Sequence, residues 1–155
     1  MTKTSKQTIA ERKKALLAAA KAPGFPSVFI SYSRKDKAIA KALAKDLSTA
    51  GAPVWWDREG VLPGDNFPAA ILSAIDAAQR VIVIWSDDAA NSPWVRDEAR
   101  RAARQNKLIT VHVPGFDAEK IPFGFGDYHS ESIEDRGRLI EALARHGAES
   151  AATAA

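Results

Sequence analysis

The residues best suited to chemistry lie in one short segment, SPWVRDEARRAARQ, at residues 92–105. Ser92 is a residue type that accepts hydrogen bonds at a helix start, and Pro93 suits the first turn, where its missing N–H costs nothing. We therefore predict a helix that begins at this Ser-Pro pair. Trp94 and Glu98 are four residues apart, so they share one face of that helix. This makes Glu98 a candidate catalytic carboxylate, held beside an aromatic ring.

A surface ion pair is the simpler role for Glu98. Arg101 lies three residues further along, close enough on a helix for an ion pair worth roughly 0.2–0.5 kcal/mol. Asp97 stands four residues before Arg101, which is the more favourable order, so we assign the pair to Asp97 and Arg101. Glu98 stays open to both roles. Trp94 is open between covering the edge of the core and lining a pocket.

The elements that must position these residues follow from an alternation along the chain. Segments rich in β-branched and aromatic residues predict strands at 27–33, 53–57, 80–86, 108–113 and 127–130. Helical spacing predicts helices at 36–51, 67–79, 92–105 and 133–146. Asp36 and Ser132 are candidate N-caps, and Gly51 is a candidate helix stop. Residues 87–91 and 114–126 are predicted to be loops.

Strands that alternate with helices, with inner strands apolar almost throughout, are typical of a parallel sheet covered on both faces. We predict an α/β, flavodoxin-like three-layer fold with a five-stranded parallel sheet, in the order 2-1-3-4-5, flanked by helices. The order comes from the common topologies of such folds and not from any residue. It brings the polar residues at 31–34 and 86–88 to one edge of the sheet, with Glu98 on the next helix.

Composition narrows the class of protein. The chain has 155 residues, a formal net charge of +3 and no cysteine, which excludes disulfides, thiolate zinc sites and a cysteine nucleophile. The basic residues have acidic neighbours and form no aromatic-rich run, so we predict no nucleic-acid partner. No apolar run approaches the ~18 residues of a membrane helix, and no secretion signal is visible. We therefore expect a cytoplasmic protein that does not bind membranes.

Three parts are expected along the chain. Residues 1–26 are an Ala-rich helical lead or linker, residues 27–146 are one folded domain, and residues 147–155 are a flexible tail or linker of small residues.

Several common catalytic motifs are absent. No phosphate-binding loop and no dinucleotide-binding glycine motif follows a predicted strand. Ser86 lacks the Gly-x-Ser-x-Gly elbow of α/β-hydrolases. The three histidines are scattered, with His112 predicted in a strand as a core or edge residue and His129 and His146 at the surface, so no metal site is predicted.

Three segments, in order, resemble the TIR (Toll/interleukin-1 receptor) domain family in its bacterial, NAD+-cleaving form. FISYSRKD at 29–36 is similar to the family's opening box, and VWWDREGVLPGDNF at 54–67 is similar to its BB loop. VIVIWSDDAANSPWVRDE at 81–98 ends in the family's pattern of Trp followed four residues later by Glu. The resemblance covers residues 26–146.

This resemblance implies cleavage of NAD+ between nicotinamide and ribose, with Glu98 at the position of the family's essential glutamate. The residues that match its nucleotide site come from the opening box and the BB loop: Tyr32, Ser33, Arg34, Gly64 and Phe67. Some members also carry an acidic residue in that loop, at a position that falls near Leu62 here, so this chain departs from their pattern.

One carboxylate is enough for this reaction, because nicotinamide leaves as a neutral base and needs no proton. The ribose that remains resembles an oxocarbenium ion, which an ionised Glu98 stabilises. Trp94 is the candidate for stacking on the pyridinium, worth ~0.5–2 kcal/mol, and Arg34 is the candidate for facing a phosphate. NAD+ is the expected substrate, with no cofactor and no metal.

Two functions from different classes stay open. The first is an NAD+ nucleosidase that hydrolyses NAD+, with or without cyclisation to a cyclic ADP-ribose isomer. It is activated by self-association with other TIR domains, as a homo-oligomer or filament, and acts in anti-phage defence signalling. The second is a non-catalytic TIR scaffold or adaptor in virulence or signalling. A sensor domain outside this chain is a further expected partner.

Overall fold

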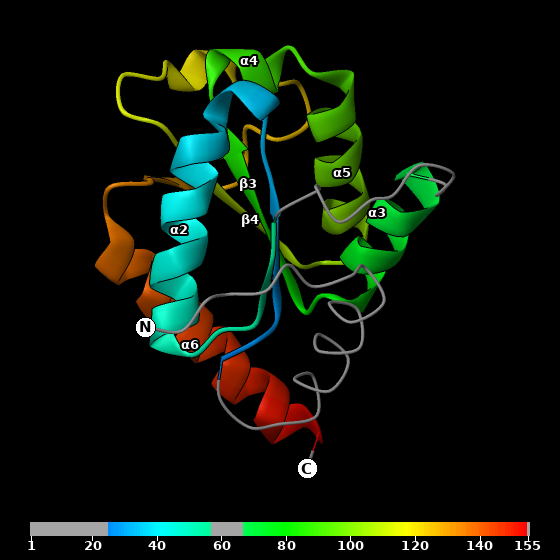
Figure 1. Cartoon of the computed structure of the whole chain (residues 1–155), viewed down its shortest axis with the longest axis vertical. Helices are drawn as coiled ribbons and strands as arrows, with labels where there is room; N and C mark the ends of the chain where they lie inside the picture. The colour runs from blue at the N-terminus through cyan, green and yellow to red at the C-terminus, as the bar shows by residue number, and fades with distance from the viewer. Residues whose placement is uncertain (1–24, 57–66, 155) are drawn as a thin grey trace, which may run out of the picture.

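The computed structural model describes residues 25–56 and 67–154, with the backbone alone described for residues 67–68 and 146–154. Figure 1 shows the whole chain. The predicted helical lead falls almost entirely outside the described residues. Most of the segment that resembles the BB loop, Gly64 included, also lies outside them.

One sheet of five parallel strands has the order β2-β1-β3-β4-β5, as predicted. The strands are β1 (Val28–Ser31), β2 (Val54–Trp55), β3 (Arg80–Trp85), β4 (Leu108–His112) and β5 (Ser130–Ser132). β3 is central, and all of its residues after Arg80 are buried. This is the pattern expected of a parallel strand that is covered on both faces.

Helices cover both faces of the sheet and complete the predicted three layers (Figure 1). The helices α2 (Lys37–Ala50) and α6 (Arg136–Ala154) pack on one face, and α3 (Phe67–Ala77) and α5 (Pro93–Arg104) pack on the other. Three shorter elements lie in the connections. η1 (Arg34–Asp36) follows β1, α4 (Asp87–Ala90) follows β3, and η2 (Ala118–Lys120) lies between β4 and β5.

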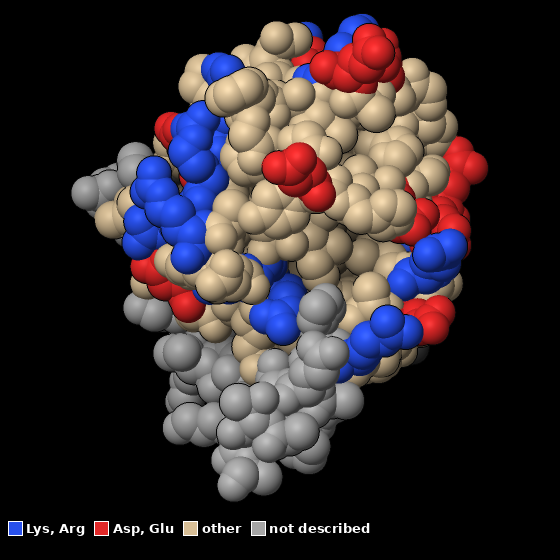
Figure 2. Space-filling model, turned by 180° about the vertical axis from the view of Figure 1, so that it is seen from behind, with Lys and Arg blue, Asp and Glu red and all other residues tan. Residues whose placement is uncertain are grey.

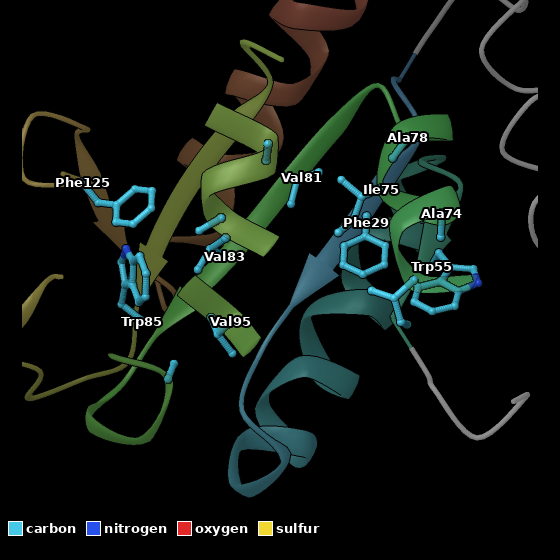
Figure 3. Packing of buried hydrophobic residues seen from close by; sticks show 14 residues of the cluster. Phe29, Trp55, Ala74, Ile75, Ala78, Val81, Val83, Trp85, Val95 and Phe125 are labelled. Carbon is cyan, nitrogen blue, oxygen red and sulfur yellow. The ribbon is translucent and has the colours of Figure 1, made fainter. Parts of the chain in front are cut away.

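The core has two clusters, one on each face of the sheet. Phe29 and Trp55 belong to the cluster under α3 and α5, where their rings stack with centroids 4.9 Å apart (Figure 3). Ile30 belongs to the cluster under α2 and α6, and so does Tyr32, which directly follows β1. Neighbouring side chains of a strand point to opposite faces, so one short segment supplies both clusters.

The end of α2 confirms the predicted glycine stop. Gly51 has φ 111° and ψ 3°, and its N–H donates to the carbonyl oxygens of Leu47 and Ser48. This left-handed conformation costs glycine nothing, because it has no Cβ to clash with the backbone.

Two local predictions near the strand ends are wrong. Residues 87–90 form the helix α4 and not a loop, because the Ser86 hydroxyl accepts the Ala89 N–H and caps the turn. Ser132 ends β5, which begins at Ser130 and not at residue 127, and its hydroxyl accepts the Glu134 N–H at 3.3 Å. Ser132 therefore caps a turn between β5 and α6 and is not the N-cap of α6.

The helix α6 continues through residues 147–154, where the sequence predicts a flexible tail or linker. Ala has the highest helix propensity of all residues, and this stretch is rich in Ala, so the helix extends through it.

The surface carries charges of both signs. Seen from behind, Lys and Arg side chains line one side of the molecule with acidic side chains near them (Figure 2). Among the described residues, no helix combines the length and apolarity needed to cross a membrane.

Candidate active site

The helix that carries the candidate carboxylate starts where the sequence predicts. Ser92 is the N-cap of α5, its hydroxyl accepts the Val95 N–H at 3.3 Å, and Pro93 is the first helical residue. The N-terminal half of α5 lies beside the carboxyl edge of the sheet, next to β1 and β3 (Figure 1).

Glu98 is buried and not a solvated surface residue. Only 3% of its surface is exposed, and its Oε1 accepts a hydrogen bond from the Ser31 hydroxyl at 2.7 Å. Burying a carboxylate is costly unless it receives hydrogen bonds. The bond from the end of β1 thus partly offsets that cost and places the carboxylate at the edge where parallel α/β sheets bind ligands.

The predicted Asp97–Arg101 pair is wrong. Arg101 donates to Asp76 on α3, from Nε at 2.8 Å and from Nη2 at 2.7 Å. Asp97 pairs with Arg100 instead, at 3.0 Å. The reason is tertiary: Arg101 faces the last turn of α3, where Asp76 accepts both of its bonds. Arg101 is thus engaged by Asp76, and the buried Glu98 accepts a hydrogen bond from Ser31 and does not form the surface ion pair proposed as its alternative role.

A cationic cluster secures α3 to α5 and to the start of β4. The Arg101 hydrogen bond is the main reason that the pKa of Asp76 falls from its usual 3.8 to about 2. Lys107 lies nearby, and its Nζ donates to the backbone oxygens of Ile75, Asp76 and Ala78. Burial lowers the pKa of this ammonium group. The last turn of α3 therefore receives the donors that its terminal carbonyls lack.

The other predicted site residues are placed in different ways. Trp94 is half-buried one turn before Glu98 and packs against the cluster under α3 and α5. Ser33 is half-buried and directly precedes η1, where Arg34 is exposed. Tyr32 turns to the opposite face of the sheet, with its ring 6.3 Å from that of Trp56. Phe67 is the first residue of α3, and only its backbone is described.

A second polar contact joins the loops at this edge. The Ser86 hydroxyl, just after β3, donates to Asp36 Oδ2 at 2.5 Å. Asp36 occupies the predicted N-cap position of α2, but its side chain makes no capping hydrogen bond. The prediction of a capping side chain is therefore wrong, because η1 already turns the chain into α2 and Ser86 takes the carboxylate.

Sequence reasoning missed the role of Ser31 and the contact between Ser86 and Asp36. A usable signal was present for Ser31, because it lies two residues after the core residue Phe29 and so points to the same face of the sheet. That face is the one that α5 covers. The predicted strand order and this alternation together were enough to predict that Ser31 faces the helix that carries Glu98.

No group of three or more possible metal ligands is found in the described part of the chain. His112 lies at the end of β4 and its Nδ1 is 2.9 Å from the Ser130 hydroxyl, which confirms its predicted place in a strand. His129 is exposed, as predicted, and contacts Glu131.

Part of this sequence is similar to that of a bacterial protein. The chain is 35% identical over 72 residues to the NAD(+) hydrolase PdTIR of Paracoccus denitrificans (strain Pd 1222). That match covers 46% of this chain and only 24% of that protein.

Solved structures agree on the fold. A TIR-STING receptor from C. gigas, in complex with 2',3'-cGAMP, matches 80% of this chain and 41% of its own, with a TM-score of 0.66 and 21% identity. The TIR domain of a Toll-related receptor from Hydra magnipapillata matches 76% of this chain and 91% of its own, with a TM-score of 0.61 and 19% identity.

The family assignment rests on a match over most of the chain. The model of the TIR domain family matches residues 28–145, which include all five strands and the helix that carries Glu98. The chain therefore belongs to the TIR domain family.

Proposed function

We propose that this domain is an NAD+ nucleosidase in which Glu98 is the catalytic carboxylate. The observation that carries the proposal is the burial of Glu98 at the carboxyl edge of the sheet, bonded to Ser31. A surface ion-pair residue has no reason to be buried there. The 35% identity to an NAD(+) hydrolase supports the same activity, over the 72 residues that match.

The chemistry needs one negative charge. The bond between C1' of the ribose and the pyridinium nitrogen breaks, and its electron pair leaves with nicotinamide, which becomes neutral. The cation left on the ribose is stabilised by the Glu98 carboxylate. Water then adds to C1' and loses a proton to give ADP-ribose, or an adenine nitrogen attacks to give a cyclic isomer.

The neighbouring residues take supporting roles in this proposal. Trp94 stacks on the nicotinamide ring, and the exposed Arg34 faces a phosphate, with Tyr32, Ser33, Gly64 and Phe67 bordering the nucleotide. Activity rises on self-association with other TIR domains as a homo-oligomer or filament, and the cytoplasmic protein acts in anti-phage defence. A sensor domain outside this chain supplies the trigger.

The test compares Glu98→Gln with Asp97→Asn. Both changes replace an acid of α5 by its amide, but Asp97 is exposed and pairs with Arg100. Purified proteins are incubated with NAD+ over a range of concentrations, and the products are separated by chromatography. We expect Glu98→Gln to lose about 10²–10³-fold in nicotinamide release, as is usual when a charge-stabilising group is removed, and Asp97→Asn to keep the parent rate.

Three results contradict parts of this proposal. Equal rates for parent and Glu98→Gln remove Glu98 from the reaction. A turnover per molecule that stays flat as concentration rises excludes activation by self-association. A parent that leaves NAD+ intact at every concentration excludes the enzyme, and the non-catalytic scaffold then becomes the leading function.

A further inference from the structure

Ser31 is the residue through which the sheet holds the candidate catalytic carboxylate. It is the last residue of β1, it is fully buried, and its neighbour in the register of β3 is Val83. Its hydroxyl donates to Glu98 Oε1 at 2.7 Å, across 67 residues of sequence. The donor therefore sits on the rigid centre of the fold, while the acceptor sits on a helix packed against it.

This geometry restrains a side chain that is otherwise flexible. A glutamate has three rotatable bonds, and its carboxylate turns freely unless a fixed donor holds one oxygen. A hydroxyl bonded to a carboxylate makes one of the shorter and stronger hydrogen bonds of proteins. Strand backbone leaves the Ser31 Oγ little freedom of its own, so the carboxylate is held in one orientation before substrate arrives.

We propose that Ser31 is a positioning residue for Glu98 and sets the turnover rate through the orientation of that carboxylate. The proposal rests on the proposed function. Ser31 does not touch the substrate in this account. Its effect falls on the step in which positive charge develops on the ribose, and substrate binding changes little.

The experiment measures kcat and KM for NAD+ in Ser31→Ala, Ser31→Cys and Ser31→Thr. Ala removes the donor, Cys keeps the shape with a weak donor, and Thr keeps the hydroxyl. We expect kcat to fall about 10–100-fold in Ser31→Ala, the usual cost of misplacing a reacting group, with KM nearly unchanged. Ser31→Cys should be intermediate, and Ser31→Thr should lie close to the parent.

Ser27→Ala is the matched control. Ser27 directly precedes β1, is also fully buried, and its hydroxyl accepts the Gln79 N–H at 3.0 Å. The Ser27→Ala substitution removes a buried hydroxyl at the opposite end of β1, away from Glu98. We expect Ser27→Ala to lower the melting temperature about as much as Ser31→Ala and to leave kcat unchanged.

The outcomes separate this proposal from the proposed function. An active parent whose kcat is unchanged in Ser31→Ala overturns the role of Ser31 alone. A kcat that falls as far in Ser31→Thr, which keeps the hydroxyl, as in Ser31→Ala assigns Ser31 to packing and also overturns it. A rise in KM without a fall in kcat makes Ser31 a binding residue instead. A parent that never releases nicotinamide excludes the proposed function, and the Ser31 proposal with it.

Discussion

The contact between Asp76 and Arg101 yields the sharpest prediction about what holds α5 in place. The two side chains join α3 to α5 through two hydrogen bonds, of 2.8 and 2.7 Å, and Gln105 adds a third to Asp76 at 2.7 Å. The perturbation is a double-mutant cycle with Asp76→Asn and Arg101→Gln, made singly and together.

The size of the coupling follows from the structure. The fall in the Asp76 pKa from 3.8 to about 2 is equivalent to about 2.4 kcal/mol if it counts in full, since one pKa unit is about 1.36 kcal/mol. The Asp76 and Arg101 side chains are 44% and 35% exposed, so water screens much of this. We therefore expect a coupling of about 1 kcal/mol, typical of well-formed pairs at the surface.

The dependence on pH has a definite sign. The pKa of Asp76 is lower in the folded chain than in the unfolded chain, so the unfolded state binds more protons in this range. The stabilisation is fully present above the unfolded value of 3.8 and disappears as pH falls through about 2. Asp76→Asn has no such carboxylate, so its stability should fall less than that of the parent over this window.

Urea denaturation measures all four proteins at neutral pH and at several acidic values. A coupling energy below about 0.3 kcal/mol at neutral pH contradicts the proposed role of the Asp76–Arg101 pair, because an ordinary ion pair within one helix contributes that much. A cycle of Asp97→Asn with Arg101→Gln serves as the control. If it gives the larger coupling, the Asp97–Arg101 pair predicted from sequence is the real one.

Two further changes test how the ends of helices are held. Lys107→Met keeps the apolar stem of Lys107 but removes its three hydrogen bonds to carbonyl oxygens at and just after the end of α3. We expect it to lower the free energy of unfolding in urea by about 2–4 kcal/mol, and we expect no comparable loss for Lys41→Met, because Lys41 is exposed. Gly51→Ala forces a side chain into a left-handed conformation at φ 111°, which costs about 1–2 kcal/mol and lowers the melting temperature. Gly137→Ala, inside α6 with nothing within 4 Å of an added Cβ, should cause no loss, and an equal loss in both variants contradicts the strain at Gly51.

The sheet was predictable because its signals are local and repeated. Each inner strand is a continuous apolar run, and each helix that follows shows helical spacing, which together favour parallel strands with crossover helices. The ends of elements were harder to predict. Ser92 and Gly51 act where their residue types predict, but Asp36 and Ser132 do not cap helices, because nearby groups outside the helix take their hydrogen bonds.

In the candidate site, too, the local features were predictable and the contacts between distant residues were not. Local sequence was enough to predict that Trp94 and Glu98 lie on one face of a helix. It was not enough to predict that this face buries Glu98 against the sheet. Its burial depends on Ser31, and the partner of Arg101 depends on Asp76 in another helix. Such partners are set by how helices pack on the sheet, and the chain alone does not specify that packing residue by residue.

The outer strands of the sheet are its shortest, and this limits how copies of the domain can associate. β2 has two residues and β5 has three, so each edge offers few backbone N–H and C=O groups to an incoming strand. Extension of the sheet from one molecule to the next is therefore a poor route to assembly for this chain. Copies that gather at high concentration would instead meet through side chains on their helices and loops, where single substitutions can tune the contact without disturbing the fold.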